Sequence, residues 1–152
     1  MHRASGTEAG LEACHSIKPF PEGDGSEPVG RTPMKITGIR PLVVAAPPHR
    51  NWIFVKIETD QPGLYGWGEA TLEWKTRGVV GCLEDFEPII VGRDPRNVTQ
   101  VWEALLKAAF WPLGVIGLTA ASAIEQALWD IKGKDLGQPV WLDVTQMQLV
   151  HQ

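Results

Sequence analysis

Long apolar runs are missing from this sequence of 152 residues. No run approaches the roughly 20 residues that a helix needs to cross a bilayer, and the N-terminal segment lacks the continuous apolar centre of a secretory signal. Cysteine is scarce: Cys14 and Cys82 lie far apart and neither belongs to a C-x-x-C pair. A structural disulfide and a zinc site therefore have little support, and we expect a cytoplasmic protein with no membrane partner.

Positive charge is also limited, because the chain has 14 Lys and Arg residues against 18 Asp and Glu residues, which gives a formal net charge of −4. The basic residues are scattered rather than gathered in a stripe, which excludes nucleic acid as an expected partner. We find no G-x-S-x-G, H-E-x-x-H, P-loop or G-x-G-x-x-G motif. The histidines fall in terminal segments or a loop, without the spacing of metal ligands: His2, His15, His49 and His151. No catalytic residue and no metal site is predicted from the residues alone.

The first part of the chain differs in composition from the rest. Residues 1–33 are rich in Gly, Pro, Ser and Glu, and such a segment buries too little apolar surface to offset its ordering entropy. We expect a disordered extension there. Strand-like sequence follows Met34 at once, so the folded unit is predicted over 34–141, and Met34 is a candidate for the natural translation start. The length and the 43% hydrophobic content suit one globular domain.

Two stretches have the alternation of β-strands. Residues 35–45 favour a strand, and Pro41 makes it an edge or bulged strand. Residues 52–59 alternate and are predicted to be a strand whose first half is covered on both sides. One face carries Ile53, Val55 and Ile57, and the other begins with Trp52 and Phe54.

A third strand is predicted to fold back on the second. Residues 60–63, Asp-Gln-Pro-Gly, suit a type II turn, so residues 64–69 should run antiparallel to the strand before them. Gly66 and Gly68 share one face of this strand, and a face without side chains lets a neighbouring element approach closely. The three strands are predicted to form an antiparallel meander.

Helical periodicity follows the strands. The apolar positions at 79, 83, 86 and 90 fit one helix face, and a second stripe runs from 98 to 109. Between them, Asp94 is predicted to be the N-cap of the second helix and Pro95 to lie in its first turn. With a third helix described next, the order is three strands then three helices, which predicts an α+β fold.

The third helix has the clearest pattern. Its apolar positions run from 120 to 131 at helical spacing. Ser122 and Glu125 have the spacing of an N-terminal capping box, and Thr119 is an alternative cap one turn earlier. Gly133 is predicted to end the helix in the left-handed conformation.

Small side chains occupy the apolar face of this helix, which implies that another surface approaches it closely. Trp129 lies off the main stripe and Trp141 lies beyond the helix, and together with Trp111 they are predicted to be unusually exposed. The small residues of the face are Ala120, Ala123 and Ala127.

Polar residues gather at one end of the predicted meander. One loop precedes the second strand and the other follows the third, so both connect at the same end of the sheet. The residues brought together there are His49, Arg50, Glu69, Glu73, Trp74 and Lys75. A solvated rim is the plainer interpretation of this cluster, and a ligand-facing loop pair is the alternative.

Four segments in this order and spacing resemble a known family: WIFVKIETD, GLYGWGEATLE, VGRDP and SAIEQALWDIKGKDLGQPVW. Together they resemble the N-terminal capping domain of the enolase superfamily, of the mandelate racemase and muconate lactonizing type. The galactonate dehydratase-like sugar-acid dehydratases are the most similar subgroup. The resemblance covers residues 34–141.

The resemblance carries expectations about function. In full-length members the cap is followed by a (β/α)₈ barrel, whose acidic residues hold Mg²⁺ and whose bases abstract the proton α to a carboxylate. This chain alone is expected to bind no Mg²⁺, and residues 142–152 resemble a truncated tail where the barrel would begin. By resemblance, the two loops of the polar cluster form a lid over a sugar-acid substrate. The residues expected to face the barrel are Ala120, Ala123, Ala127, Trp129 and Trp141.

Two other functions stay open on the sequence. One is a non-catalytic interaction module that uses the barrel-facing helix surface for another partner. The other is an independent small enzyme that acts through His49 and Glu73. A homo-oligomer is compatible with each.

Overall fold

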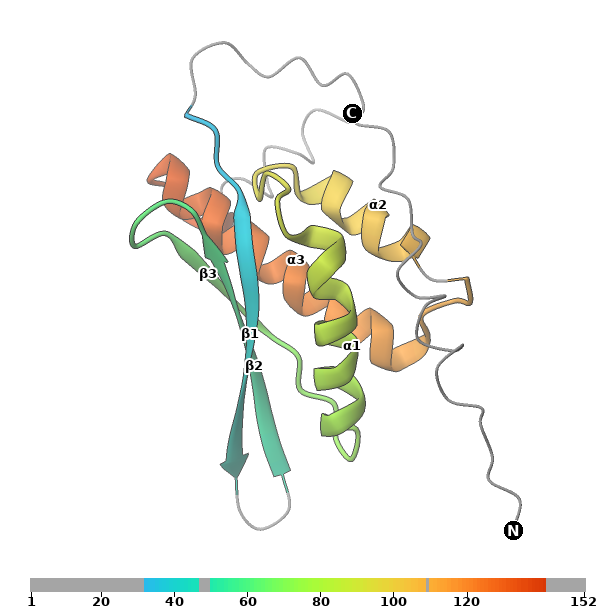
Figure 1. The fold of residues 1–152 in the computed structure, drawn as a ribbon. Coiled ribbons are helices and arrows are strands. Elements are labelled where there is room, and N and C mark those ends of the chain that lie inside the picture. Colours follow the sequence, from blue (N-terminus) through green and yellow to red (C-terminus); the bar gives the residue numbers. More distant parts are fainter. Residues whose placement is uncertain (1–31, 47–49, 109, 142–152) are drawn as a thin grey trace, which may run out of the picture. The chain divides into compact units, whose positions relative to one another are not determined.

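The computed structural model describes residues 32–46, 50–108 and 110–141. They form three antiparallel strands in the order β1-β2-β3, followed by three helices, as Figure 1 shows. The predicted α+β fold is confirmed. The elements are β1 Ile36–Ala46, β2 Arg50–Thr59, β3 Tyr65–Glu69, α1 Thr76–Ile90, α2 Val98–Ala108 and α3 Gly114–Leu136.

The predicted extension and tail lie almost wholly outside the described residues. Thr32 and Pro33 are the exception, since they contact the folded unit. The Thr32 carbonyl accepts a hydrogen bond from Arg96 Nη2 at 2.8 Å, and the Pro33 carbonyl accepts one from Gln61 Nε2 at 3.2 Å. The folded unit therefore receives contacts from these two residues, and the disorder predicted for residues 1–33 stays a prediction.

Strand β1 lies at the edge of the sheet, as Pro41 predicted. It pairs only with β2, and the register places Pro41 opposite Val55. The irregularity in the ladder falls between Ile36 and Gly38 rather than at the proline. A proline is tolerated here because its missing N–H is on the side of the strand that has no partner.

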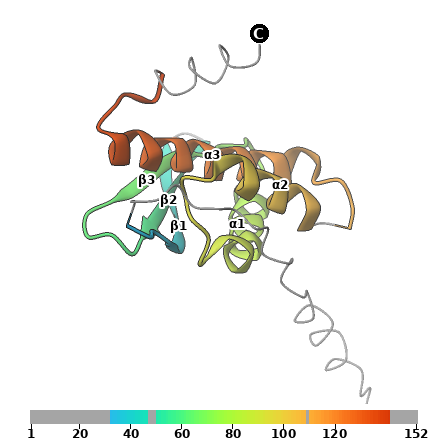
Figure 2. The ribbon, with the colours of Figure 1, turned by 90° about the horizontal axis from the view of Figure 1, so that it is seen from above.

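The two faces of the sheet have different environments. Figures 1 and 2 show the helices on one face of it. On that face Ile53, Val55 and Ile57 are fully buried. On the other face Trp52 is 48% exposed and Phe54 is 37% exposed. The prediction that the first half of this strand is covered on both sides is therefore wrong for the described residues.

Helix α3 packs directly on strand β3, and the glycines of the strand make this possible. A methyl group on Gly66 would overlap the Ala127 carbonyl, and one on Gly68 would overlap the Ala123 carbonyl. The helix backbone thus lies against the strand backbone, and the predicted close approach is confirmed. Helix α3 also contacts α1 and α2.

The same packing corrects the predicted role of the alanine face. Ala120, Ala123 and Ala127 are completely buried within the domain, in the core that α3 forms with the sheet and helix α1. These three side chains have no surface left for a barrel or for another partner, so the prediction that they face one is wrong. The alanine face of α3 does pack closely, as predicted, but it packs against the sheet of the same domain.

The predicted ends of the helices also need correction. Helix α3 begins at Gly114, so Thr119 and Ser122 lie inside it, and Thr119 Oγ1 donates to the Val115 carbonyl at 2.7 Å. It ends at Gly137, which has φ of 64°, rather than at Gly133. Buried Gly133 instead lets the chain after the helix come close, because a methyl group there would lie 2.9 Å from the Gln138 carbonyl oxygen.

Asp94 is not the N-cap of helix α2. Its Oδ1 accepts a hydrogen bond from the Arg96 N–H at 2.9 Å and pairs with Arg96 Nε at 3.0 Å. The helix starts only at Val98. The Asp-Pro pair thus shapes a turn that precedes the helix, because a short acidic side chain can close such a turn on its own backbone.

Among the described residues, no helix is long and apolar enough to cross a membrane. The buried apolar core joins the covered face of the sheet to all three helices. Its largest fully buried members are Ile36, Ile53, Ile57, Leu83, Ile90, Leu105, Ile124, Leu128 and Ile131.

Candidate functional site

A pocket of about 580 Å³ lies where the start of strand β2 meets the loop before helix α1. Its walls come from two segments that are separated by the whole β2–β3 hairpin. These two segments are the ones that the sequence predicted to meet at one end of the meander. The lining residues are Arg50, Asn51, Leu72, Glu73, Trp74, Lys75, Thr76, Arg77 and Gly78.

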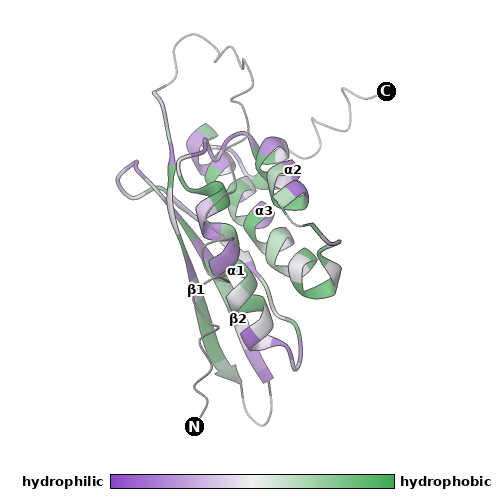
Figure 3. Cartoon of the chain, turned by 45° about the vertical axis from the view of Figure 1, so that its right-hand side comes forward, coloured by the Kyte–Doolittle hydropathy of each residue, from purple (hydrophilic) through white to green (hydrophobic). Residues whose placement is uncertain are grey.

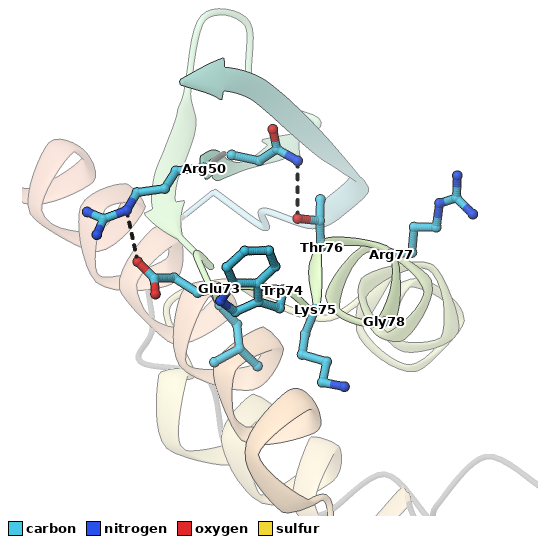
Figure 4. Close-up of a pocket in the computed structure, with 9 residues that line it drawn as sticks. Arg50, Glu73, Trp74, Lys75, Thr76, Arg77 and Gly78 are labelled. Carbon is cyan, nitrogen blue, oxygen red and sulfur yellow. Dashed lines mark hydrogen bonds and ion pairs between the residues drawn. The ribbon is translucent and has the colours of Figure 1, made fainter. Parts of the chain in front are cut away.

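Two polar contacts join the two segments across the pocket. Arg50 Nε lies 3.2 Å from Glu73 Oε1, and Asn51 Nδ2 donates to Thr76 Oγ1 at 3.4 Å. Figure 4 shows the ion pair on one side of the Trp74 ring and Thr76 on the other. The side chains of Arg50 and Glu73 are 72% and 57% exposed, so water screens this pair and it adds little to stability. The pair therefore joins the two segments only weakly.

The loop after β3 is held to the sheet by its first residues. The Ala70 N–H donates to the Ile53 carbonyl at 2.8 Å, and the Ile53 N–H donates to Thr71 Oγ1 at 3.0 Å. The Thr71 N–H in turn donates to Glu69 Oε1 at 2.9 Å. These bonds fix the entry of the loop, so the residues that follow it start from a rigid base.

Glu69 is therefore not part of the pocket, contrary to the prediction. Its carboxylate accepts the Thr71 N–H, and its own N–H donates to Gln126 Oε1 at 3.1 Å. The strand alternation also places it on the sheet face opposite to Gly68. The Glu69 carboxylate thus helps to shape the loop, and its role in a lid stays a prediction.

Trp74 has an unusual backbone for its residue type. Its φ is 65°, which is the left-handed region that bulky side chains seldom adopt. The indole is 82% exposed at the pocket, so no burial of this ring offsets the strain. Such strain is typical of residues at functional sites. A large apolar surface is thus presented to whatever occupies the pocket.

Positive charge predominates in the pocket. Arg50, Lys75 and Arg77 stand against one carboxylate, that of Glu73. In Figure 4 the side chains of Lys75 and Arg77 point in different directions, so they do not converge on one point. Their combined field nevertheless favours an anionic ligand over a cationic one.

Four of the six predicted cluster residues line this pocket: Arg50, Glu73, Trp74 and Lys75. His49 lies outside the described residues. The sequence missed Thr76, Arg77 and Gly78, because the first helix was predicted from its first apolar position and α1 begins three residues earlier. In the described part of the chain, no three His, Cys, Asp or Glu residues are placed to hold a metal ion.

The predicted exposure of three tryptophans is confirmed for two of them. Trp111 is 76% exposed and Trp141 is 66% exposed. Trp129 is partly buried against the core, with Lys132 Nζ 4.7 Å from the centre of its ring. The prediction was wrong for Trp129, because a side chain at the border of the apolar stripe can fold back onto the core. Whether Trp129 and Trp141 face a barrel stays a prediction.

Comparison with known proteins gives consistent matches. Residues 31–142 match the family model of the mandelate racemase / muconate lactonizing enzyme N-terminal domain. The D-galactonate dehydratase of Verminephrobacter eiseniae is 42% identical over 108 residues, which are 71% of this chain and 27% of that protein. A D-galactonate dehydratase family member of Cellvibrio japonicus is 42% identical over 109 residues, with 71% and 26% covered.

Solved structures agree in fold. The crystal structure of an enolase from Pantoea ananatis, with bound D-gluconate and Mg, matches with a TM-score of 0.67 and 36% identity over 72% of this chain and 26% of that chain. A member of the enolase superfamily from Salmonella Typhimurium matches with a TM-score of 0.62 and 39% identity over 68% and 27%. The chain therefore spans about a quarter of the length of these relatives.

Proposed function

This chain belongs to the mandelate racemase / muconate lactonizing enzyme N-terminal domain family of the enolase superfamily, and on that basis we propose that it is the capping and specificity domain of a sugar-acid dehydratase. The proposed substrate is a galactonate-like acid. The observation that carries the proposal is the pocket between two loops, which combines an excess of positive charge with an exposed indole. The 42% identity to a D-galactonate dehydratase supports the subgroup.

The chemistry of the pocket suits such a substrate. An aldonate carries one carboxylate, which the field of Arg50, Lys75 and Arg77 attracts. Its carbon chain carries hydroxyl groups, and Asn51 and Thr76 can exchange their mutual hydrogen bond for bonds to them. The indole of Trp74 offers a broad apolar surface to the C–H side of the molecule.

The proposed reaction removes the proton α to the carboxylate and then eliminates water. In it, the residues of this chain orient the acid and exclude bulk water, which lowers the barrier by positioning. Arg50 would leave Glu73 to hold an anionic group of the substrate. In the full-length family Mg²⁺ belongs to the reaction, but the described residues offer no set of ligands for it, so no step of this chain is assigned to a metal.

The domain limits and the partner are part of the proposal. Residues 34–141 would act as the cap, and a (β/α)₈ barrel would supply the bases and the metal ligands. Residues 142–152 would stand where that barrel begins. The cytoplasmic location expected from the sequence stays a prediction.

A domain exchange tests the proposal. Residues 32–141 of this chain would replace the matching segment of the Verminephrobacter eiseniae D-galactonate dehydratase. We expect the chimera to convert D-galactonate to the 2-keto-3-deoxy acid with Mg²⁺ present, and we expect this chain alone to show no turnover. The unaltered relative serves as the control for the assay. A folded chimera with no activity on any aldonate, or turnover by the isolated chain, would contradict the capping function.

Substitutions in that chimera test the role of the pocket. Trp74→Ala and Arg50→Ala should each change the ratio of kcat/KM between two aldonates by about tenfold or more, since a substrate is discriminated by its contacts in the transition state. Two matched controls remove the same residue types elsewhere. Trp111→Ala removes an indole that is 76% exposed, and Arg40→Ala removes a surface ion pair with Glu58 at 3.7 Å. Equal effects of pocket and control variants would refute the assignment.

A further inference from the structure

The two walls of the pocket leave the sheet from one contact. Strand β2 contributes Arg50 and Asn51 to one wall, and the loop before α1 contributes the other wall from Leu72 onward. Figure 3 shows hydrophilic colour in both segments, at the start of β2 and in the loop before α1. Ile53 lies two residues after the first wall, and Thr71 directly precedes the second. The contact between Ile53 and Thr71 therefore stands at the base of both walls.

At this base a side chain replaces the backbone of a regular sheet. The register of β2 with β3 would next pair Ile53 with Ala70, and a hydrogen-bonded antiparallel pair exchanges two backbone bonds. The Ala70 N–H does donate to the Ile53 carbonyl, at 2.8 Å. The Ile53 N–H, however, donates to Thr71 Oγ1 at 3.0 Å. The threonine hydroxyl therefore decides where the loop separates from the sheet.

The bond from Ile53 to Thr71 is hard to replace, because its donor is buried. Ile53 is 0% exposed, and a buried N–H that loses its acceptor keeps the full cost of its desolvation. The backbone of Thr71 is held as well, since its N–H donates to Glu69 Oε1 at 2.9 Å. The Glu69 N–H in turn donates to Gln126 Oε1 at 3.1 Å. Thr71 is thus fixed to β2 through its side chain and, through Glu69, to helix α3.

The contacts within the pocket are too weak to set the distance between its walls. The Arg50–Glu73 ion pair is exposed and screened by water, and the second polar contact is long, at 3.4 Å. Trp74 has a strained left-handed backbone and an exposed indole, and such strain persists only where the surrounding structure holds the residue in place. Thr71, three residues earlier and partly buried, supplies such a hold.

We propose that Thr71 is a positioning residue for the pocket. It does not itself line the pocket, so it acts on the substrate by fixing the separation and orientation of the two walls. The inference rests on the proposed function, because it takes the pocket to be the site of the aldonate. Positioning of this kind matters for the reaction, since a misplacement of about 1 Å can lower a rate about 100-fold.

Amide hydrogen exchange on the full chain tests the structural half of the proposal. Thr71→Val keeps the β-branched shape but removes the acceptor, whereas Thr71→Ser keeps the hydroxyl. We expect Thr71→Val to speed exchange at Ile53 and in residues 72–75 by about tenfold or more, because local opening becomes easier. Thr71→Ser should restore the wild-type rates. Thr119→Val is the matched control, since the Thr119 hydroxyl bonds within α3, and it should leave these amides unchanged.

Kinetics in the chimera described above test the effect on the substrate. We expect Thr71→Val to raise KM for D-galactonate by about tenfold with a smaller change in kcat, because the walls then bind the acid less well. Thr71→Ser should restore KM, and Thr119→Val should change neither constant. A loss of folded protein alone would lower the measured kcat and leave KM unchanged. The split between KM and kcat therefore separates positioning from stability.

Two results would overturn the proposal. One is unchanged exchange at Ile53 and in the loop of Thr71→Val. The other is a Thr71→Val chimera that keeps the KM of the unsubstituted chimera, or a raised KM that Thr71→Ser does not reverse.

A second variant covers the case in which Thr71→Val does not fold, as circular dichroism would show. Gln126→Ala removes the exposed acceptor of the Glu69 N–H, and it should speed exchange in residues 72–75 and raise KM in the same direction by less. Unchanged values for Gln126→Ala would then refute the proposal. An unsubstituted chimera without activity would refute the proposed function and the role toward the substrate, while the exchange rates would still decide whether Thr71 holds the two walls.

Discussion

Apolar side chains alternate onto both faces of the sheet, but only one face is buried by the helices. On the covered face Ile53, Val55 and Ile57 have no exposed surface, and Gly66 and Gly68 admit helix α3 against the strand backbone. The face that no helix covers, the open sheet face, carries larger side chains, including Trp52, which is 48% exposed, and Phe54, which is 37% exposed. Apolar periodicity therefore identifies a strand, but it does not tell which of its faces the same domain covers.

The most severe test of the covered face is Gly68→Val. The new side chain would have to occupy the space of the Ala123 carbonyl, and backbone cannot move aside as a flexible side chain can. We expect a loss of more than about 3 kcal/mol, at the upper end of overpacking effects, and little folded protein. Thermal melts followed by circular dichroism measure it.

Gly81→Ala is the control for this glycine. It lies within helix α1 and nothing stands within 4 Å of an added methyl group. It should be neutral or stabilise by up to about 1 kcal/mol, because alanine is the better helix former. Equal destabilisation by both glycine variants would contradict the close packing of α3 on β3.

Substitutions of two neighbouring residues of β2, one on each face of the sheet, compare the stability contributed by the two faces. Ile53→Ala should cost about 2–5 kcal/mol, because it leaves a cavity in a fully buried site. Trp52→Ala removes a larger side chain, yet it should cost less, about 1–2 kcal/mol for the monomer, because about half of that residue already contacts water. Urea denaturation at low protein concentration gives both values. A larger cost for Trp52→Ala in the monomer would show that the open sheet face is covered within one chain.

Ala123→Leu tests the helix side of the same contact. The side chain of Ala123 is fully buried, and its backbone lies against Gly68, so extra methyl groups should cost roughly 1–3 kcal/mol. Ala104→Leu in α2 enlarges a partly exposed alanine and should cost less. Equal free energies of unfolding for this variant and the wild type would mean that the face is open after all.

The smallest effect concerns pH on the open sheet face. The hydrogen bond from Lys56, together with the nearby charge of Arg40, lowers the pKa of Glu58 below its ordinary value. The folded state therefore binds the proton less well than the unfolded chain, and the stability from this group is lost as the pH falls through the folded pKa. Glu58→Gln should remove a slight part of the loss of stability between about pH 5 and about pH 2. The same change in the free energy of unfolding with pH for the wild type and Glu58→Gln would contradict this prediction.

Local chemistry let the sequence predict several features correctly. Alternation at residues 52–59 predicted β2, Pro41 predicted an edge strand, and the glycines at 66 and 68 predicted close approach on β3. The four pocket residues that were predicted, Arg50, Glu73, Trp74 and Lys75, follow from the meander, because its topology alone brings the two loops to one end of the sheet.

Only the tertiary structure decided the rest. Ser122 and Glu125 have the spacing of a cap, but that spacing also fits mid-helix, and α3 continues upstream to Gly114. Alanines on a helix face indicate close packing in general. Only the tertiary structure shows that strand β3 is the packing partner, because its glycines lie against the backbone of Ala123 and Ala127. Likewise, Trp52 and Phe54 have the residue types of a core, whereas their exposure depends on where the helices pack. A sequence records which residues can be buried, and the position of the neighbouring elements determines which ones are.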